Sequence, residues 1–204
     1  PLDKRHTTFL RPYANTSLGK APLYFEGDRV AVYRVQQTAG GLEGGVNLGV
    51  HGQVRFGWVE RRIGAVLDTG PDDFLNLTER LGGATGALAI DTYDQPFFPT
   101  RGVKLDVTHF EALNVTQGGA KYSRSEMRLG GAYSLGPWVV LAGLEGGTAP
   151  KGTLPLADAF TLGGPRRLAG FANDQMRGQD YAFGRLEGQY RLNFASPLWG
   201  LTLI

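Results

Sequence analysis

Few residues of this chain have the types and spacing that catalysis requires. A serine hydrolase built on a strand–helix elbow needs its serine in the string G-x-S-x-G, which does not occur in the chain. The nearest string, residues 132–136 around Ser134, lies between two predicted strands and is expected to form a hairpin turn. We therefore predict that this segment is not an enzyme and holds no catalytic residue.

The histidines of the chain offer little more. His109 and Glu111 are two residues apart, so in a strand they share one face and could form a base with its orienting carboxylate, or half of a metal site. Two ligands do not make a metal site, and the alternative is that both are ordinary polar residues. The chain has no cysteine, which excludes a disulfide framework, a zinc–thiolate site and a cysteine nucleophile. The sequence predicts no metal and no cofactor.

Composition narrows the class of protein. The chain has 204 residues, 31 of them glycine, and a formal net charge of +2. Its basic residues are dispersed rather than clustered, which argues against nucleic acid as a partner. No run of 18 or more apolar residues is present, so a transmembrane helix is not expected. The chain starts at Pro1 and stops within an apolar pattern, and we expect it to be a segment of a longer protein.

The dominant pattern is an alternation of apolar and polar residues, which is typical of strands with two unlike faces. The clearest apolar sets are Leu42, Val46, Leu48 and Val50; Val54, Phe56 and Trp58; Val103, Leu105 and Val107; and Leu186, Tyr190 and Leu192. The pattern predicts an all-β chain with strands over 7–17, 28–37, 41–51, 53–61, 62–68, 83–92, 102–112, 120–134, 137–147, 181–193 and 198–204. The stretch 148–180 does not alternate, and a connection that long is either functional or wrongly assigned.

Two architectures explain the alternation. A soluble sandwich turns its polar residues to water outside, whereas an outer-membrane barrel turns its apolar residues to lipid and its polar residues to a wet lumen. Small residues on the polar face suit a crowded lumen, and aromatic residues near strand ends suit interfacial girdles. The glycines in question are Gly45, Gly49, Gly57 and Gly143, and the aromatics are Tyr13, Tyr33, Trp58, Tyr122, Trp138 and Trp199. We therefore favour an antiparallel transmembrane β-barrel and keep a soluble β-rich domain as the alternative.

Two segments carry a resemblance to a known family. Residues 160–171 resemble the conserved loop of the bacterial surface antigen barrels, a superfamily that includes outer-membrane assembly and secretion transporters. Residues 174–186 are similar to the branch that is fused to patatin-like phospholipases, and residues 91–102 resemble a second turn of the same barrels. The loop motif comprises Leu162, Gly163, Gly164, Arg166, Arg167, Leu168, Gly170 and Phe171.

The resemblance implies a sixteen-stranded barrel, of which residues 1–204 are a part that lacks the closing strands, with loop 148–180 directed into the lumen. In such barrels an arginine at the loop tip meets acidic groups on the inner wall. This chain departs from that pattern, because Ala169 precedes Gly170. Arg166 and Arg167 are the nearby substitutes, and we expect one of them to contact Glu187 on the next strand. The alternative is that both arginines are solvated.

Function follows from the resemblance by analogy only. It implies a barrel in the outer membrane of a Gram-negative bacterium, in contact with lipid, that anchors an upstream patatin-like lipase passenger of the same chain. Translocation of that passenger and pairing into a homodimer are left open, and Arg185 joins Glu187 as a candidate inner-wall partner of the loop. The competing hypotheses are a porin-like channel without a passenger and a soluble domain, which would need no detergent.

Overall fold

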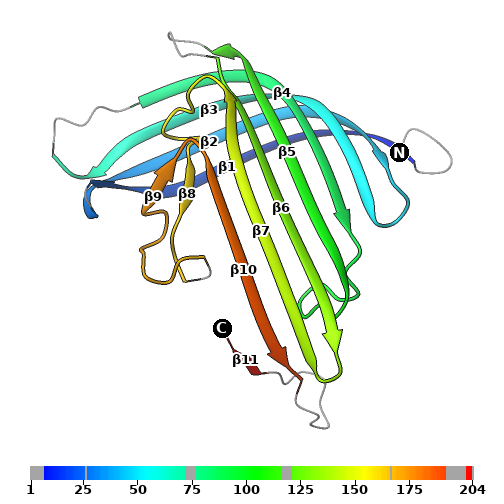
Figure 1. Ribbon diagram of the computed structural model, residues 1–204. Helices are drawn as coiled ribbons and strands as arrows, with labels where there is room; N and C mark the ends of the chain where they lie inside the picture. The colour runs from blue at the N-terminus through cyan, green and yellow to red at the C-terminus, as the bar shows by residue number, and fades with distance from the viewer. Residues whose placement is uncertain are drawn as a thin grey trace.

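The computed structural model describes residues 7–25, 27–71, 77–115, 121–165, 167–191 and 201–203. Over these ranges the chain is all-β, with a nine-stranded antiparallel sheet and a separate two-stranded sheet. The large sheet curls into half of a barrel, and the small one lies on its concave side (Figure 1). In the part of the chain so described, no helix is long and apolar enough to cross a bilayer.

Strands of the large sheet that follow one another along the chain pair with one another. The single described connection that carries further strands is the loop from β7 to β10, which contains β8 and β9. The bounds are β1 (Thr8–Phe25), β2 (Asp28–Asn47), β3 (Gly52–Thr69), β4 (Leu77–Asp91), β5 (Gly102–Val115), β6 (Ser123–Leu135), β7 (Trp138–Lys151), β8 (Phe160–Leu162), β9 (Met176–Gly178), β10 (Tyr181–Tyr190) and β11 (Leu201–Leu203).

The connections alternate between the two ends of the sheet. The end that carries the β1–β2, β3–β4, β5–β6 and β7–β10 connections is here termed the loop end. The opposite end, with the β2–β3, β4–β5 and β6–β7 connections, is termed the turn end.

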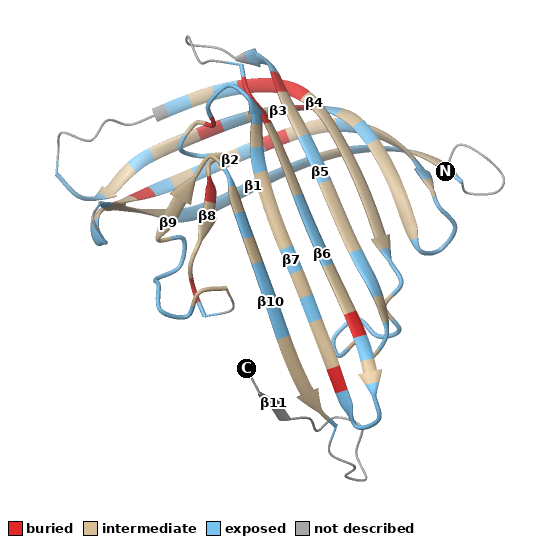
Figure 2. Cartoon of the chain, in the orientation of Figure 1, coloured by how far each residue is buried: buried red, intermediate tan, exposed pale blue. Residues whose placement is uncertain are grey.

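The convex face carries a band of apolar side chains that no other part of the described chain covers. Leu105 lies opposite Ile90 on one side and Leu129 on the other, and Leu129 lies opposite Leu144. Large apolar side chains on this face stay accessible, with Leu129 at 38% and Leu144 at 47% exposure. Figure 2 shows the burial of the described residues, and those of the large sheet that are buried are few and scattered. A water-soluble domain rarely leaves so extended an apolar face open.

The band has the height that a membrane requires. On β7 it runs from Trp138 to Gly146, nine positions, and a tilted transmembrane strand needs about 9 to 11 residues. At the turn end, the ring of Trp138 packs edge-on against Tyr190 with centroids 4.9 Å apart. On β3 the band ends toward the loop end at Trp58, whose indole N–H donates to the Glu60 carboxylate over 2.8 Å. Indole rings with one apolar and one polar neighbour are typical of a membrane interface.

The aromatic girdle expected from the sequence is formed only in part. Trp58 and Trp138 are on the convex face, but Tyr33 and Tyr122 are buried, at 8% and 2% exposure. These two tyrosines lie where the loop packs against the sheet, so they support protein contacts rather than lipid contacts. Trp199 lies outside the described residues.

Two pairs of strands expected to be separate are single continuous strands. β2 and β3 have 20 and 18 residues, so the predicted breaks near residues 38–40 and 61–62 were wrong. The cause is a change of phase within β3. Near the turn end the outward residues, such as Phe56, are apolar, whereas near the loop end the apolar residue Ile63 points inward and is 5% exposed. The alternation therefore slips by one position where the strand leaves the lipid, and this slip resembles a strand boundary.

Glycines on the concave face make room for long side chains, as expected. A Cβ on Gly57 would lie 2.7 Å from Cγ of Glu43, and one on Gly143 would lie 2.8 Å from Nε of Arg185. Gly49 has another role, because it stands in the β2–β3 turn with φ +65°.

Candidate functional site: a loop held on the concave face

The loop from β7 to β10 begins with a buried apolar base. Leu154 and Phe160, each 3% exposed, form a cluster with Ala112 and Tyr122 at the loop end of the sheet. The backbone of Leu154 is fixed by Gln179, whose carboxamide accepts from the Leu154 N–H (2.6 Å) and donates to its carbonyl (3.2 Å). The two ends of the loop are thereby held together beside the wall.

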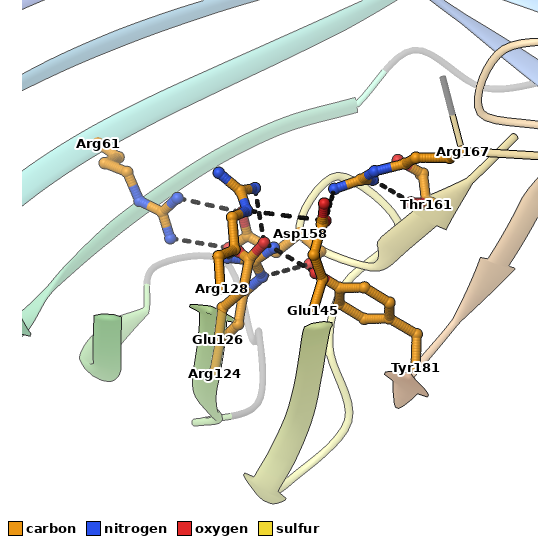
Figure 3. Close-up of polar contacts among 9 residues, drawn as sticks. All are labelled: Arg61, Arg124, Glu126, Arg128, Glu145, Asp158, Thr161, Arg167 and Tyr181. Carbon is orange, nitrogen blue, oxygen red and sulfur yellow. Dashed lines mark hydrogen bonds and ion pairs between the residues drawn. The ribbon is translucent and has the colours of Figure 1, made fainter. Parts of the chain in front are cut away.

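Asp158 fastens this base to the far side of the sheet. Its carboxylate accepts hydrogen bonds from Nη1 and Nη2 of Arg61, at 3.0 and 2.7 Å, and from the hydroxyl of Tyr122. Its carbonyl accepts from Nε of Arg124 at 3.1 Å. The Arg61 and Asp158 side chains are only 15% and 10% exposed, and Figure 3 shows the guanidinium aimed at the carboxylate from β3. A two-point guanidinium–carboxylate contact is among the stronger polar contacts in proteins.

The environment of this contact is largely shielded from solvent. Burial, together with the neighbouring Asp158 carboxylate, raises the pKa of the Tyr122 hydroxyl. The guanidinium of Arg61 also lies 4.3 Å from the centroid of the Phe110 ring. The Tyr122 phenol is therefore neutral, and can donate to Asp158, over the whole physiological pH range.

Phe160 is the apolar counterpart of this contact. Its ring lies beneath the guanidinium of Arg124, 4.3 Å away, and 5.0 Å from the ring of Tyr181. A Cβ on Gly147 would come within 2.3 Å of the ring. A glycine at position 147 on β7 is thus a condition for seating the loop.

The motif that follows forms a tight turn. Gly163 and Gly164 have φ of +135° and +99°, values that L side chains rarely adopt. The carbonyl of Gly164 accepts from the N–H groups of Arg167 (3.1 Å) and Leu168 (2.9 Å). A Cβ on Gly163 would also lie 2.2 Å from the carbonyl oxygen of Ala172. Both glycines are therefore required by the backbone.

The turn directs Arg167 at the wall. Its guanidinium donates to the carboxylate of Glu145 on β7 and to the carbonyl of Thr161 at 3.2 Å. The expected partner Glu187 instead lies beside Arg185, with 3.5 Å between their charged groups. The expected Arg167–Glu187 contact is corrected to Arg167–Glu145. Glu145 lies opposite Phe183 of β10 and therefore closer to the loop end than Glu187. The turn descends only to the level of Glu145.

The remaining motif residues form the outer part of the loop. Leu168 pairs with Gly164 in an isolated bridge, whereas Gly170 is exposed and Phe171 is 45% exposed. Arg166 lies outside the described residues.

Beyond the motif, the returning half of the loop reaches the other edge of the described sheet. Arg177 donates from Nη2 to the carbonyl of Pro22 on β1 at 3.1 Å, and Gln175 donates to the carbonyl of Gly27 at 3.4 Å. Together with Arg61 on β3 and Glu145 on β7, these contacts attach the loop to strands across the concavity. Arg61 and Asp158 are 97 positions apart in the sequence.

The wall under the loop is charged but paired. Glu126 on β6 lies 3.0 Å from Arg124 and 2.7 Å from Arg128, and it accepts from the hydroxyl of Tyr181 at 3.0 Å. Arg128 also comes within 4.0 Å of Glu145. Figure 3 shows these groups as one network from β6 and β7 to Arg167. Arg167 of the loop thus joins a network of ion pairs that residues of β6 and β7 form with one another.

Sequence reasoning missed the strongest loop contact. Neither Arg61 nor Asp158 belongs to a motif, and the predicted strand break at 61–62 concealed that Arg61 lies on the concave face. A usable signal was present: Arg61 interrupts the inward apolar series of Val59 and Ile63, and an isolated cation among buried apolar residues needs a partner.

The other candidate chemistry does not assemble. Ser134 is the penultimate residue of β6, next to the hairpin turn that was expected there, and its hydroxyl donates to the carbonyl of Thr100 at 2.8 Å. Nδ1 of His109 is 2.8 Å from the hydroxyl of Ser125, and Glu111 pairs with Lys151 on the convex face. Among the residues that the structure describes, no group of three or more possible ligands could hold a metal ion.

The family of the chain agrees with this architecture. No curated protein matches the chain. The family model described as the Omp85 superfamily domain matches residues 24–202. This range includes the whole β7–β10 loop and the sheet from the end of β1 onward. Together with the fold, this family points to the bacterial outer membrane. The resemblance to the surface antigen barrels is confirmed at this level, and the chain belongs to the Omp85 superfamily.

Proposed function

We propose that this chain forms part of an outer-membrane barrel that anchors an upstream passenger domain in that membrane, and that the β7–β10 loop obstructs the lumen. This loop comprises residues 152–180, because residues 148–151 of the predicted loop 148–180 belong to β7. The observation that carries the proposal is the attachment of one loop to opposite parts of the concave wall, through Asp158 to Arg61 and through Arg167 to Glu145. A loop of this kind would fill the lumen instead of lining it. The barrel would then be an anchor that conducts poorly.

Conductance of the complete protein in a planar bilayer tests the obstruction. The register of the small sheet allows a clean deletion, because Leu162 lies opposite Met176. Residues 163–175 can therefore be replaced by Asn-Gly, the pair that favours a two-residue hairpin turn. This variant keeps Asp158 and the small sheet but loses the Arg167 contact and the outer part of the loop.

We expect the loop-shortened protein to conduct several-fold more than the wild type. Glu111→Gln, which removes an ion pair on the convex face, is the matched control and should conduct as the wild type does. A wild type that is already a wide, steadily open channel would favour the porin-like alternative. Equal and low conductance of all three proteins would contradict the plug.

The passenger is the finer part of the proposal, and the similarity of residues 174–186 to the patatin-linked branch supports it. If the barrel anchors a lipase that precedes this chain, protease added to whole cells should release the passenger while the barrel stays in the membrane. A passenger that protease reaches only after the cells are opened would refute export but not anchoring. Absence of any attached domain would leave the barrel alone as the function.

A further inference from the structure

The base of the β7–β10 loop leaves a cavity between itself and the concave wall. The cavity has a volume of about 100 Å³ and lies between β1–β3 and the loop segment before Asp158. Its apolar lining includes Leu23, Val35, Ile63 and Ala65 from the wall and Pro155 and Leu156 from the loop. A cavity of about 150 Å³ holds benzene, which is ~25 Å³ for each heavy atom. The space beside the loop therefore takes a molecule of about four heavy atoms.

Contacts on both sides of the cavity keep the loop from settling into it. The carbonyl of Pro155 accepts from the N–H of Asp158 at 2.9 Å, which fixes the turn that covers the cavity. Arg177 donates from Nη1 to the carbonyl of Leu156 and from Nη2 to the carbonyl of Pro22 on β1, each over 3.1 Å. Filling the cavity by a shift of the loop would break these hydrogen bonds. The cavity is thus a property of the seated loop.

Glu79 on β4 supplies an acidic group to this apolar cavity. It lies directly opposite Ile63 and lines the cavity beside the Arg61–Asp158 contact. Burial and the Asp158 carboxylate raise the pKa of Glu79, and Arg61 opposes that shift. Arg61 already donates two hydrogen bonds to Asp158. Within the described part of the chain, no hydrogen bond or ion pair reaches the Glu79 carboxylate. Two carboxylates therefore share one guanidinium, and one negative charge is left over.

The other charged group of the lining does not balance Glu79. Both Nη atoms of Arg177 donate to carbonyls, and its Nε is buried. Arg177 is also absent from the charges that shift the pKa of Glu79. A carboxylate among apolar side chains requires either a proton or a cation. A single carboxylate does not make a metal site, whereas an organic ammonium offers three N–H donors and an apolar body for the rest of the cavity.

We propose that the cavity binds a small primary alkylammonium ion, with the ammonium on Glu79 and the alkyl chain between Ile63, Ala65 and the loop. The N–H groups would donate charge-assisted hydrogen bonds to the carboxylate. Because wall and loop both line the cavity, the ligand binds the seated loop alone and stabilises that state. The site goes beyond the proposed function, and its occupation does not depend on whether a passenger is attached.

The test uses the complete protein in nanodiscs and two probes of equal size, n-propylammonium and propan-1-ol. Saturation-transfer NMR titrations give the Kd of each probe, which we expect in the submillimolar to millimolar range because a ligand of about four heavy atoms gains little free energy. Propylammonium should bind the wild type about tenfold more tightly than the alcohol. Glu79→Gln should lower the affinity for propylammonium about tenfold and leave the affinity for propan-1-ol unchanged, which also shows that the cavity persists in this variant.

Hydrogen exchange locates the bound probe. At a propylammonium concentration about nine times its Kd, amides of β9 should exchange about tenfold more slowly than without it, because only the seated loop binds. Amides of β5 and β6 at the turn end should exchange at the same rate with and without the probe. Unchanged exchange in β9 at saturation would overturn the placement of the ligand under the loop.

Two control variants complete the test. Asp106→Asn removes a carboxylate that lies opposite Arg128 on the same concave face, outside the cavity, and should bind both probes as the wild type does. Ala65→Leu adds three carbon atoms, which fill most of the cavity at ~25 Å³ each, and should abolish binding of both probes. Equal affinity for the amine and the alcohol, or equal loss in Glu79→Gln and Asp106→Asn, would overturn recognition by Glu79. Full binding to Ala65→Leu would place the ligand elsewhere and overturn the site.

Discussion

Removal of the Asp158 carboxylate should detach the loop base from the sheet. In Asp158→Ala, Arg61 would keep its charge at 15% exposure without the carboxylate that accepts its two hydrogen bonds. Loss of one partner from a buried ion pair costs about 3–5 kcal/mol. Since both side chains of this pair retain some contact with solvent, the lower end, about 3 kcal/mol, applies.

The cost should appear as local opening of the loop. At 1.4 kcal/mol for each tenfold change, about 3 kcal/mol raises the open population by a factor of roughly 100. Hydrogen exchange measures this population directly when the loop closes faster than its amides exchange. We therefore expect the amides of β8 and β9 to exchange about 100-fold faster in Asp158→Ala, with β5 and β6 unchanged at their turn ends.

Two further variants test whether the Arg61–Asp158 contact holds the loop. Glu111→Gln removes a solvent-exposed ion pair, which contributes at most about 1 kcal/mol, and should leave exchange in the loop unchanged. The double substitution Arg61→Met and Asp158→Leu replaces both charges by apolar groups, which is often nearly neutral, and should restore most of the protection. If Asp158→Ala exchanges no faster than Glu111→Gln, the contact does not hold the loop.

Three other predictions concern the wall, the lipid face and the turn end. Gly147→Ala would push a methyl group into the aromatic ring seated above it, and we expect a loss of about 1–3 kcal/mol in urea unfolding from micelles. Leu129→Arg would place a charge in the apolar band and cost about 2–4 kcal/mol in folding into vesicles, whereas the inward Thr108→Arg should cost much less. Hydrogen bonds from Thr100 and Arg101 hold the pKa of Asp94 at about 2. A carboxyl whose pKa is lower in the folded than in the unfolded state stabilises the fold above the unfolded value, near 3.9, and this stabilisation is lost as the pH falls to about 2. Pepsin should therefore cleave the exposed 97–98 bond faster at pH 2 than at pH 4 when each rate is divided by that of an unfolded peptide with the same bond, which removes the pH dependence of pepsin itself. Asp94→Asn should abolish the remaining difference.

The loop motif was enough to predict the family but not the wall residue that the loop contacts. A local motif was sufficient to identify the family. Its Gly163 and Gly164 adopt positive φ values that other residues rarely adopt, so this backbone requirement is visible in the residue types alone. The motif did not identify the partner of Arg167, because Glu145 lies four positions closer to the loop end than Glu187 on the neighbouring strand, and which of the two is reached depends on the depth to which the turn descends.

The sequence by itself determined the class of fold and the direction of its faces where lipid meets the sheet. Val103, Leu105 and Val107 point outward, as their alternation predicts, because a strand exposed to hydrocarbon on one side and to polar groups on the other must alternate. The same rule placed the starts of β5 and β7 to within one residue, but the two strands continue to Val115 and Lys151, beyond the predicted ends at 112 and 147.

Only the tertiary structure decided what happens toward the loop end. There the solvent outside is water and the concave face is covered by protein, so the polarity of both faces reverses and the alternation changes phase within β2 and β3. The curvature of the sheet then brings Arg61 within reach of Asp158. No local pattern contains that distance, since it is set by how far the whole half-barrel has curled.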